Sequence, residues 1–393
     1  MATDHTCSMI EPDSSASGDT EHQTVESDYA SIASTIPNYV YQNGRRYHSH
    51  RMDQYLLPND EREQERLDFI HHIFRLTLGG ELCYAKLDNP QRILDIGTGT
   101  GIIAVGETFP SAEVIGTDLS PTQSSWAPPN VQFLVDDALQ DWVFPESSFD
   151  FIHIRTLGGN IPDWLSFMQK CYKYLKPGGQ IEISECRPRF CCDDNSYPQE
   201  CRTRHWMNEF ERVTAQTGLE FDPFPQCAGR LQQAGFQDVE AVERVVPIGT
   251  WPKDKALKTR GRYFMAQLLG NALETYTLSL FTRTAGWTPD EVYTLLNGVT
   301  EEVSRNKMHL YTHFDFTVQE HDLNDTSYIR QKLNLQLRIN AYRSNHQGGT
   351  DTLSRFPARR SPKSIEPHPK RRTVEMTRGE LTSAGGQEDS NSR

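Results

Sequence analysis

The chain lacks any long apolar run and, over its first forty residues, any Lys or Arg. No stretch approaches the roughly 20 apolar residues that a membrane-spanning helix needs. The same forty residues carry seven Asp or Glu and no apolar segment of the secretory type, so no secretory signal is predicted. We therefore expect neither secretion nor a membrane partner.

The eight cysteines follow no spacing typical of disulfide-bonded or zinc-binding proteins. No Cys-x-x-Cys pair occurs, although four cysteines cluster at positions 186, 191, 192 and 201. Without a secretory signal, the cysteines are predicted to be reduced thiols. The pattern predicts no metal site, and zinc bound by the cluster is kept only as an alternative.

Positive charge is in deficit: 40 basic residues against 53 acidic ones leave a net charge of −13. This balance argues against direct nucleic-acid binding. Near the end of the chain, however, residues 355–372 include seven basic residues and, as a neighbouring acid, only Glu366: the basic residues are Arg355, Arg359, Arg360, Lys363, Lys370, Arg371 and Arg372. These residues form two small clusters separated by a spacer, a pattern that is typical of a nuclear-import signal and equally of a basic tail exposed to solvent. We expect a cytoplasmic or nuclear protein.

Composition divides the chain into three parts. Residues 1–40 are acidic, rich in Ser and Thr and poor in large apolar residues, and they are predicted to be disordered. Residues 41–320 are predicted to form one folded domain. Residues 321–393 are polar and partly basic, and we expect them to be largely disordered.

Within the folded part, short apolar runs alternate with helical patterns, which predicts an α/β fold with a mostly parallel sheet covered on both faces. The runs that predict strands are residues 92–96, 112–118, 131–135, 149–154, 180–184, 239–248 and 309–318. Helices are predicted at 102–108, 164–175, 200–216, 230–234, 254–284 and 288–306. Residues 44–81 are also predicted to be helical, with residues 45–60 as an ordered lead-in, because apolar residues recur there at helical spacing.

The most informative motif is the glycine-rich turn that follows the strand at 92–96: Gly97-Thr98-Gly99-Thr100-Gly101. A phosphate-binding loop requires Gly-Lys-Ser/Thr, whereas Ile102 and Ile103 follow here. A dinucleotide site requires Gly-x-Gly-x-x-Gly/Ala, whose third position is the bulky Ile102. The spacing Gly-x-Gly-x-Gly suits a cofactor without a pyrophosphate, such as S-adenosylmethionine. A nicotinamide oxidoreductase is kept as a third hypothesis.

Acidic residues end the first three predicted strands, at the edge where open α/β sheets bind ligands. Asp118, followed by Leu119, lies 21 residues after Gly97, where a carboxylate can accept hydrogen bonds from both ribose hydroxyls. Asp136-Asp137-Ala138 ends the third strand, where an acid can accept from the adenine amino group and alanine leaves room for the ring. Asp95 is expected to face the methionine ammonium group. For each acid, a solvated strand end is the alternative.

Four motifs in order along the chain resemble the class I S-adenosylmethionine-dependent methyltransferases: Leu-Asp-Ile-Gly-Thr-Gly-Thr-Gly, Val-Ile-Gly-Thr-Asp-Leu-Ser-Pro, Phe-Asp-Phe-Ile-His-Ile-Arg and Leu-Lys-Pro-Gly-Gly. Flanking sequences at residues 43–48, 55–61, 125–131, 251–254, 261–263 and 281–283 are similar to those of the fungal LaeA-like methyltransferases. The resemblance covers residues 41–317. The chain differs in continuing for some seventy residues beyond the final strand, where members of this family usually end.

This resemblance implies a Rossmann-like fold with a seven-stranded sheet and a helical insertion before the last strand. It also implies S-adenosylmethionine as cofactor and a role in fungal secondary metabolism. The main hypothesis is an enzyme that methylates a small-molecule metabolite or a protein. The alternative is a nuclear regulator of metabolite gene clusters that binds regulatory protein partners and methylates little.

The candidate residues for chemistry are few. His153, next to the sheet edge, can act as a base toward a hydroxyl or amine, but a structural histidine inside a strand is the alternative that the sequence favours. Tyr47 and Tyr55 of the lead-in are candidates to close over the cofactor, with ordinary packing as the alternative. The sequence does not identify the methyl acceptor.

Overall fold

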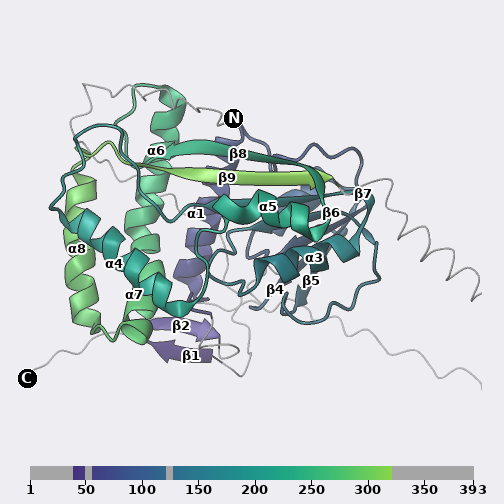
Figure 1. Cartoon of the computed structure of the whole chain (residues 1–393), viewed down its shortest axis with the longest axis horizontal. Helices are drawn as coiled ribbons and strands as arrows, with labels where there is room; N and C mark the ends of the chain where they lie inside the picture. Colours follow the sequence, from purple (N-terminus) through teal and green to yellow (C-terminus); the bar gives the residue numbers. More distant parts are fainter. Residues whose placement is uncertain (1–38, 49–54, 121–126, 321–393) are drawn as a thin grey trace, which may run out of the picture. The chain divides into compact units, whose positions relative to one another are not determined.

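The computed structural model describes residues 39–48, 55–120 and 127–320 (Figure 1). The predictions of disorder for residues 1–40 and 321–393, and the basic clusters that suggested nuclear import, lie outside the described residues except at positions 39 and 40. Tyr39 and Val40 belong to a strand, so the prediction of disorder is wrong for these two residues. The described residues all belong to one compact unit. The boundaries of the predicted domain at residues 41 and 320 stay a prediction.

A seven-stranded sheet forms the centre of this unit, in the order β5-β4-β3-β6-β7-β9-β8. Its strands are β3 (Arg92–Ile96), β4 (Glu113–Asp118), β5 (Val131–Val135), β6 (Phe149–Arg155), β7 (Leu175–Cys186), β8 (Gln237–Pro247) and β9 (Tyr311–Glu320). Neighbouring strands from β5 through β7 run parallel, whereas β9 is antiparallel to both β7 and β8. The prediction of a mostly parallel seven-stranded sheet is confirmed.

Helices cover both faces of the sheet because successive side chains of each strand point to opposite faces. Ile93 and Phe151 pack with Ile102 of α2 (Ile102–Thr108), whereas Leu94 and Ile152 pack on the other face. That second face is covered by α3 (Trp164–Tyr174) and α5 (Phe224–Ala234). After β5 the chain returns to the other side of β3, so the strand order reverses between β3 and β6. Open α/β folds bind ligands outside the carboxyl ends of the strands at such a reversal.

A helical insertion separates β8 from β9, as predicted. It consists of α6 (Lys255–Gln267), a π-helical turn η1 (Leu268–Ala272), α7 (Leu273–Thr284) and α8 (Pro289–Ser304). Thr288 and Glu291 form a capping box at the start of α8, with Pro289 as its first residue. Helix α4 (Arg202–Thr217), which follows β7, packs against α7 and α8. The insertion thereby encloses the carboxyl end of β7.

The prediction of helix from residue 44 onward is wrong over its first part. Residues 39–48 form a hairpin of β1 (Tyr39–Gln42) and β2 (Arg45–His48). Asn43 and Gly44 connect the strands with φ angles of 52° and 74°, and an Asn-Gly pair favours this kind of tight turn. Helix α1 (Glu61–Thr77) begins only after Asp60, whose side chain accepts a hydrogen bond from the Glu63 amide.

Candidate cofactor cavity and its surroundings

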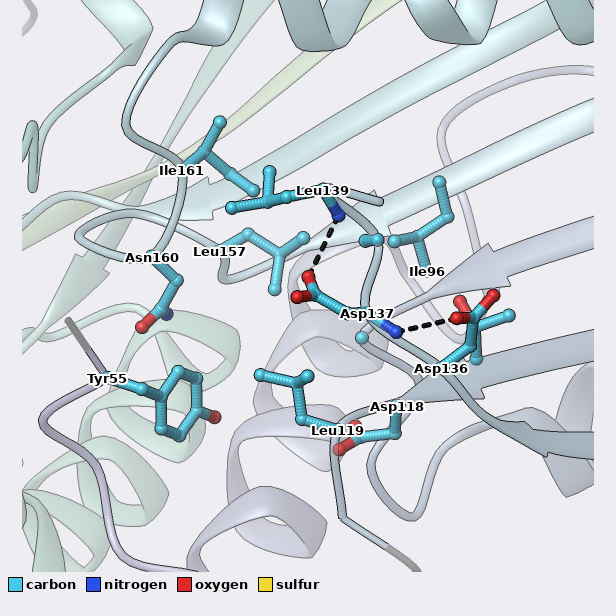
Figure 2. Close-up of a pocket in the computed structure, with 13 residues that line it drawn as sticks. Tyr55, Ile96, Asp118, Leu119, Asp136, Asp137, Leu139, Leu157, Asn160 and Ile161 are labelled. Carbon is cyan, nitrogen blue, oxygen red and sulfur yellow. Dashed lines mark hydrogen bonds between the residues drawn. The ribbon is translucent and has the colours of Figure 1, made fainter. Parts of the chain in front are cut away.

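A cavity with a volume of about 60 Å³ opens at the carboxyl ends of β3, β4 and β5. Figure 2 shows its wall, to which the strand ends, the loop after β6 and the segment before α1 contribute. The lining residues are Tyr55, Ile96, Gly97, Thr117, Asp118, Leu119, Asp136, Asp137, Ala138, Leu139, Leu157, Asn160 and Ile161. We call this space the cofactor cavity.

The glycine-rich turn borders the cavity through Gly97, which has a φ angle of +66°. A Cβ atom at Gly97 would lie 2.6 Å from Cδ2 of Leu157, so this position requires glycine for conformation and for space. Gly99 and Gly101 do not line the cofactor cavity. A Cβ at Gly99 would meet Leu67 of α1 at 3.0 Å, so this glycine allows close packing of the turn on α1.

Asp118 ends β4 with its carboxylate held by two backbone amides. Oδ2 accepts a hydrogen bond from the Gly99 N–H and Oδ1 from the Ser120 N–H, each at 2.9 Å. Burial raises the pKa of Asp118 above its ordinary value, although both amides favour the charged form. Each oxygen retains a lone pair for a further donor, which gives this wall two fixed hydrogen-bond acceptors.

The end of β5 places three more predicted residues in the wall. Asp136 Oδ1 accepts a hydrogen bond from the Asp137 N–H at 2.8 Å, and Asp137 Oδ1 accepts one from the Leu139 N–H at 3.0 Å (Figure 2). These bonds form a tight turn that places Ala138 beside the two acids. The sequence-predicted acids of β4 and β5 therefore lie in one cavity.

Asp95 and His153 lie together, outside the set of residues that line the cofactor cavity. They are partners in the register of β3 and β6, and His153 Nδ1 lies 2.7 Å from Asp95 Oδ1. Thr98 Oγ1 donates to the other Asp95 oxygen at 2.5 Å. Burial opposes ionisation, but His153 and Thr98 outweigh it and lower the pKa of Asp95. This network connects Thr98 of the glycine-rich turn to β3 and β6. The role of His153 as a base stays a prediction.

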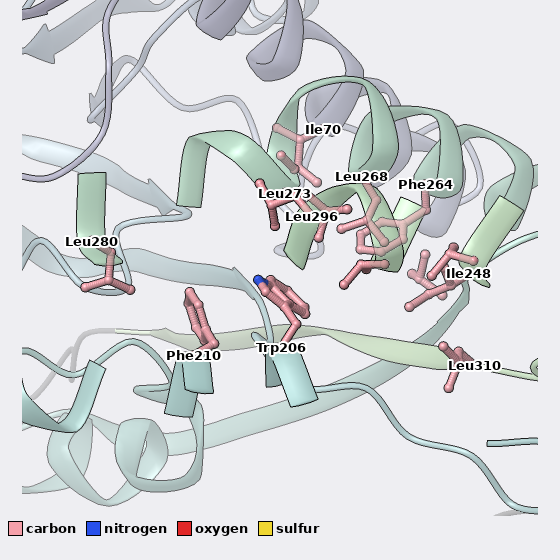
Figure 3. Packing of buried hydrophobic residues seen from close by; sticks show 14 of the residues in the cluster. Ile70, Trp206, Phe210, Ile248, Phe264, Leu268, Leu273, Leu280, Leu296 and Leu310 are labelled. Carbon is pink, nitrogen blue, oxygen red and sulfur yellow. The ribbon is translucent and has the colours of Figure 1, made fainter. Parts of the chain in front are cut away.

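A second cavity, with a volume of about 90 Å³, lies beyond the loop that follows β6. Its wall is mainly aromatic and aliphatic, and Trp206 and Phe210 of α4 face side chains of the helical insertion (Figure 3). Thr156 and Gly158 line this second cavity, whereas Leu157 between them lines the cofactor cavity. The two spaces are therefore neighbours across one short segment.

The structure separates the two tyrosines of the lead-in. Tyr55 lines the cofactor cavity, and its ring lies 4.5 Å from the ring of His48. Tyr47 is buried elsewhere, with the guanidinium of Arg283 at 4.6 Å from its ring centre. The position of Tyr55 matches the prediction, whereas Tyr47 packs on α7 because it belongs to the hairpin.

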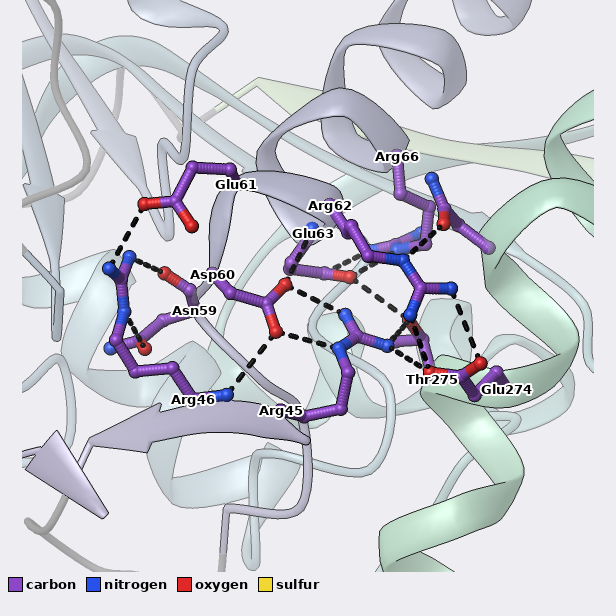
Figure 4. Close-up of polar contacts among 11 residues, drawn as sticks. Arg45, Arg46, Asn59, Asp60, Glu61, Arg62, Glu63, Arg66, Glu274 and Thr275 are labelled. Atoms are coloured by element: carbon purple, nitrogen blue, oxygen red, sulfur yellow. Dashed lines mark hydrogen bonds and ion pairs between the residues drawn. The ribbon is translucent and has the colours of Figure 1, made fainter. Parts of the chain in front are cut away.

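A buried ion pair attaches this hairpin to the rest of the unit (Figure 4). Arg45, only 1% exposed, donates to both carboxylate oxygens of Asp60, at 2.6 and 2.9 Å, and contacts Glu274 of α7 at 3.1 Å. Asn59 donates to Ser120 just after β4, at 3.2 Å. The segment that carries Tyr55 is therefore tied at Asp60 to α1 and at Asn59 to the cavity wall.

Sequence reasoning missed the contribution of the loop after β6. Leu157, Asn160 and Ile161 line the cofactor cavity, and the sequence signal was their position just after a strand at the binding edge. Ile96, Thr117 and Leu139, which adjoin predicted residues, were also missed. Among residues 39–48, 55–120 and 127–320, no group of three or more His, Cys, Asp or Glu could hold a metal ion. No helix in these ranges is long and apolar enough to cross a membrane.

Comparison with known proteins agrees with this geometry. A family model described as a methyltransferase domain matches residues 62–241. "Methyltransferase pytC" of Aspergillus terreus is 41% identical, covering 75% of this chain and 90% of that protein. "Secondary metabolism regulator LAE1" of Cochliobolus heterostrophus is 35% identical, covering 70% and 92%. "Protein-methionine methyltransferase laeA" of Emericella nidulans is 32% identical, covering 69% and 73%.

The sheet topology, the glycine turn and these matches define a class I S-adenosylmethionine-dependent methyltransferase. The chain belongs to the fungal methyltransferase family that includes pytC and the LaeA-type proteins of secondary metabolism. The predicted family, enzyme class and cofactor are confirmed.

Proposed function

We propose that S-adenosylmethionine binds in the cofactor cavity and that this enzyme methylates a small molecule of fungal secondary metabolism. The observation that carries the proposal is the pairing of two spaces. A cavity whose wall carries the carboxylates of Asp118, Asp136 and Asp137 adjoins a mainly apolar cavity across residues 156–158. A buried space of this kind suits a compact acceptor.

The carboxylates and apolar side chains of the cavity wall support this proposal. In this proposal, the two fixed oxygens of Asp118 accept hydrogen bonds from the ribose hydroxyls. Asp136 and Asp137 hold the adenine amino group, beside the small side chain of Ala138. Leu119 and Ile161 supply apolar surface for the ring, and Gly97 lets Leu157 pack closely against the turn at the cavity wall.

The predicted residues that do not line the cavity support it without touching the cofactor: Asp95, Thr98, Gly99, Gly101 and Tyr47. Asp95 and Thr98 hold the turn in shape, and Gly99 and Gly101 allow it to pack closely on α1 and β6. Tyr47 secures the hairpin, and Tyr55 covers the cavity. The cofactor supplies an activated methyl group when bound, and the chain's residues orient it and exclude water.

Substitution of Gly97 by Ala tests the placement of the cofactor. The new methyl group would enter an occupied space at a positive φ angle, so the dissociation constant for S-adenosylmethionine should rise at least tenfold. Titration calorimetry measures this constant directly. Gly229→Ala, on an open helical position, is the matched control and should leave binding unchanged. Equal affinity in both variants would contradict the placement.

A second candidate function is a regulator that modifies a protein. It is supported by the names of two relatives, one a regulator of secondary metabolism and one a protein-methionine methyltransferase. Metabolite profiles of a deletion strain discriminate between the two: loss or demethylation of one compound favours the enzyme of small molecules, and loss of many unrelated compounds favours the regulator. A fluorescent fusion excluded from nuclei would count against a nuclear regulator.

A further inference from the structure

The second cavity contains polar groups that the cofactor site does not use. Its apolar wall includes Phe190, Trp206, Phe210, Phe221 and Phe264. Into this wall are set Glu185 at the end of β7, Arg66 of α1, Gln267 of α6 and Tyr276 of α7. Polar side chains buried in an apolar cavity are stable only when they find partners, so their free atoms indicate what the cavity receives.

Glu185 stands where the two cavities meet. Only 5% of the residue is exposed, and Oε1 accepts hydrogen bonds from the amides of Leu157 and Gly158 at 2.8 and 3.1 Å. Leu157 lines the cofactor cavity and Gly158 the second cavity. Oε2 accepts no hydrogen bond from the part of the chain that the structure describes. One oxygen is therefore fixed by the backbone, and the other is available to a ligand.

One nitrogen of Arg66 has no hydrogen-bond partner among the described residues (Figure 4). Its Nε and Nη2 donate to the two oxygens of the buried Glu63, at 2.8 and 2.7 Å. Its guanidinium lies 5.1 Å from the ring centre of Tyr276. Nη1 is buried and makes no hydrogen bond to any described residue. Glu63 already balances the charge of Arg66, so the open position calls for a neutral acceptor, such as a carbonyl oxygen.

We propose that the second cavity binds the methyl acceptor, an apolar ring compound whose carbonyl oxygen accepts from Arg66 Nη1 and whose hydroxyl group gives its proton to Glu185. This inference rests on the proposed function, because it requires the methyl donor in the neighbouring cavity. During transfer the bond between the hydroxyl oxygen and the methyl carbon forms while the methyl–sulfur bond breaks. The hydroxyl proton passes to Glu185 Oε2, so the product is a neutral methyl ether.

The surroundings of Glu185 support a role as a base that works at mildly alkaline pH. Burial raises the pKa of Glu185 to about 8, against the two amides that favour its charged form. The titratable groups that interact with it are acidic or neutral: Asp222 before α5, Asp315 of β9, Cys227 of α5, Cys186 of β7 and Tyr276 of α7. Two cations line the same cavity, but each is paired with another carboxylate, Arg66 with Glu63 and Arg187 with Asp222. Methyl transfer is therefore expected to increase as the pH rises through 8.

Binding of small probes tests the cavity without turnover. The full-length protein, saturated with S-adenosylhomocysteine, is titrated calorimetrically with methyl para-hydroxybenzoate, with para-cresol, which lacks the carbonyl, and with methyl benzoate, which lacks the hydroxyl. Each missing hydrogen bond should weaken binding about fivefold or more. Ala272→Phe, which fills the cavity from its wall, should abolish probe binding while the affinity for S-adenosylhomocysteine stays unchanged.

Two further variants assign the polar groups. Arg66→Lys removes Nη1 but retains a cation for Glu63, so the preference for methyl para-hydroxybenzoate over para-cresol should disappear. Glu185→Gln should keep probe binding within about threefold of wild type. Transfer of a labelled methyl group to para-cresol, whose hydroxyl stays protonated up to about pH 9, should fall at least a hundredfold in this variant, and the rise of the rate near pH 8 should vanish.

The outcomes separate this inference from the proposed function. Failure of the wild-type protein to bind S-adenosylhomocysteine would contradict the cofactor placement. Normal binding of S-adenosylhomocysteine with no probe binding, or with equal binding by Ala272→Phe, would overturn the inference alone. Probe binding without methyl transfer between pH 7 and 9, or full activity of Glu185→Gln, would remove the role of Glu185 as base. Methylation of a protein with no methylation of the small probe would overturn the inference, because the acceptor would then be an amino-acid side chain.

Discussion

The paired side chains of His153 and Asp95 illustrate how a position in the sheet determines a role. Both face the same side of adjacent strands, and each is the other's partner in the register of β3 and β6. At 6% and 5% exposure they form a buried ion pair or hydrogen bond, depending on the proton of His153. The pair also contacts the glycine turn, because Thr98 Oγ1 donates to the other oxygen of Asp95.

Substitution of His153 by Phe should therefore reduce stability. Without its partner the buried Asp95 carboxylate is left uncompensated, and the free energy of unfolding should fall by about 3 kcal/mol. Urea denaturation measures the change. His309→Phe, which breaks a more exposed contact with Asp194, is the matched control and should cost less than about 1 kcal/mol. Unchanged stability with loss of methyl transfer would instead favour His153 as the base.

Among the secondary-structure elements, the hairpin β1–β2 shows the largest departure from the sequence prediction. Its Asn43-Gly44 turn is a known signal, but the apolar periodicity that begins in α1 concealed it. The hairpin is a two-stranded sheet separate from the main one, and such a unit is stable only when packed on a larger structure. Arg45 provides this connection, through Asp60 at the start of α1 and Glu274 in α7.

Replacement of Arg45 by Met should release the hairpin. Asp60 would lose its buried partner, so the free energy of unfolding should fall by about 3–5 kcal/mol, and amide exchange in β1 and β2 should accelerate. Because the same segment carries Tyr55, cofactor affinity should also weaken. Arg305→Met, which removes an exposed pair with Glu301, should change stability by less than about 0.5 kcal/mol. Unchanged exchange in the hairpin would show that Arg45 does not hold it.

For the domain as a unit, two buried carboxyl groups predict a pH dependence of stability. Burial raises the pKa of Glu185 and of Asp315 to about 8 each. In the unfolded chain such groups titrate near 4, so between these values the folded state binds more protons than the unfolded state. The free energy of unfolding should therefore fall as the pH rises from 7 to 8, by up to about 1.4 kcal/mol per pH unit for each group.

Thermal unfolding across this range measures the slope. The double variant Glu185→Gln with Asp315→Asn should flatten it, because neither amide titrates. Asp163→Asn serves as control: a hydrogen bond from Ser166 lowers the pKa of Asp163, so this carboxylate is ionised in both states at pH 7 and the slope should not change. A slope that persists in the double variant would mean that other groups cause it.

The local pattern of the sequence was enough to predict the seven strands of the main sheet, the order of strands and helices after residue 61, and the glycine-rich turn after β3. Apolar runs and glycine spacing act over a few residues, and the acids of β4 and β5 meet simply because parallel strands end at one edge. The prediction of helical structure at residues 254–284 also holds, although a π-helical turn at Leu268–Ala272 interrupts the α-helix.

Long-range contacts determined the remaining features. Whether Tyr47 or Tyr55 reaches the cavity depends on the docking of the hairpin by Arg45, whose partner Glu274 is 229 residues away in the sequence. The second cavity joins Arg66, Glu185 and Tyr276 from α1, β7 and α7, and no short motif relates these positions. Sequence spacing therefore identified the methyl donor, whereas the second cavity arises only when distant helices pack around the end of β7.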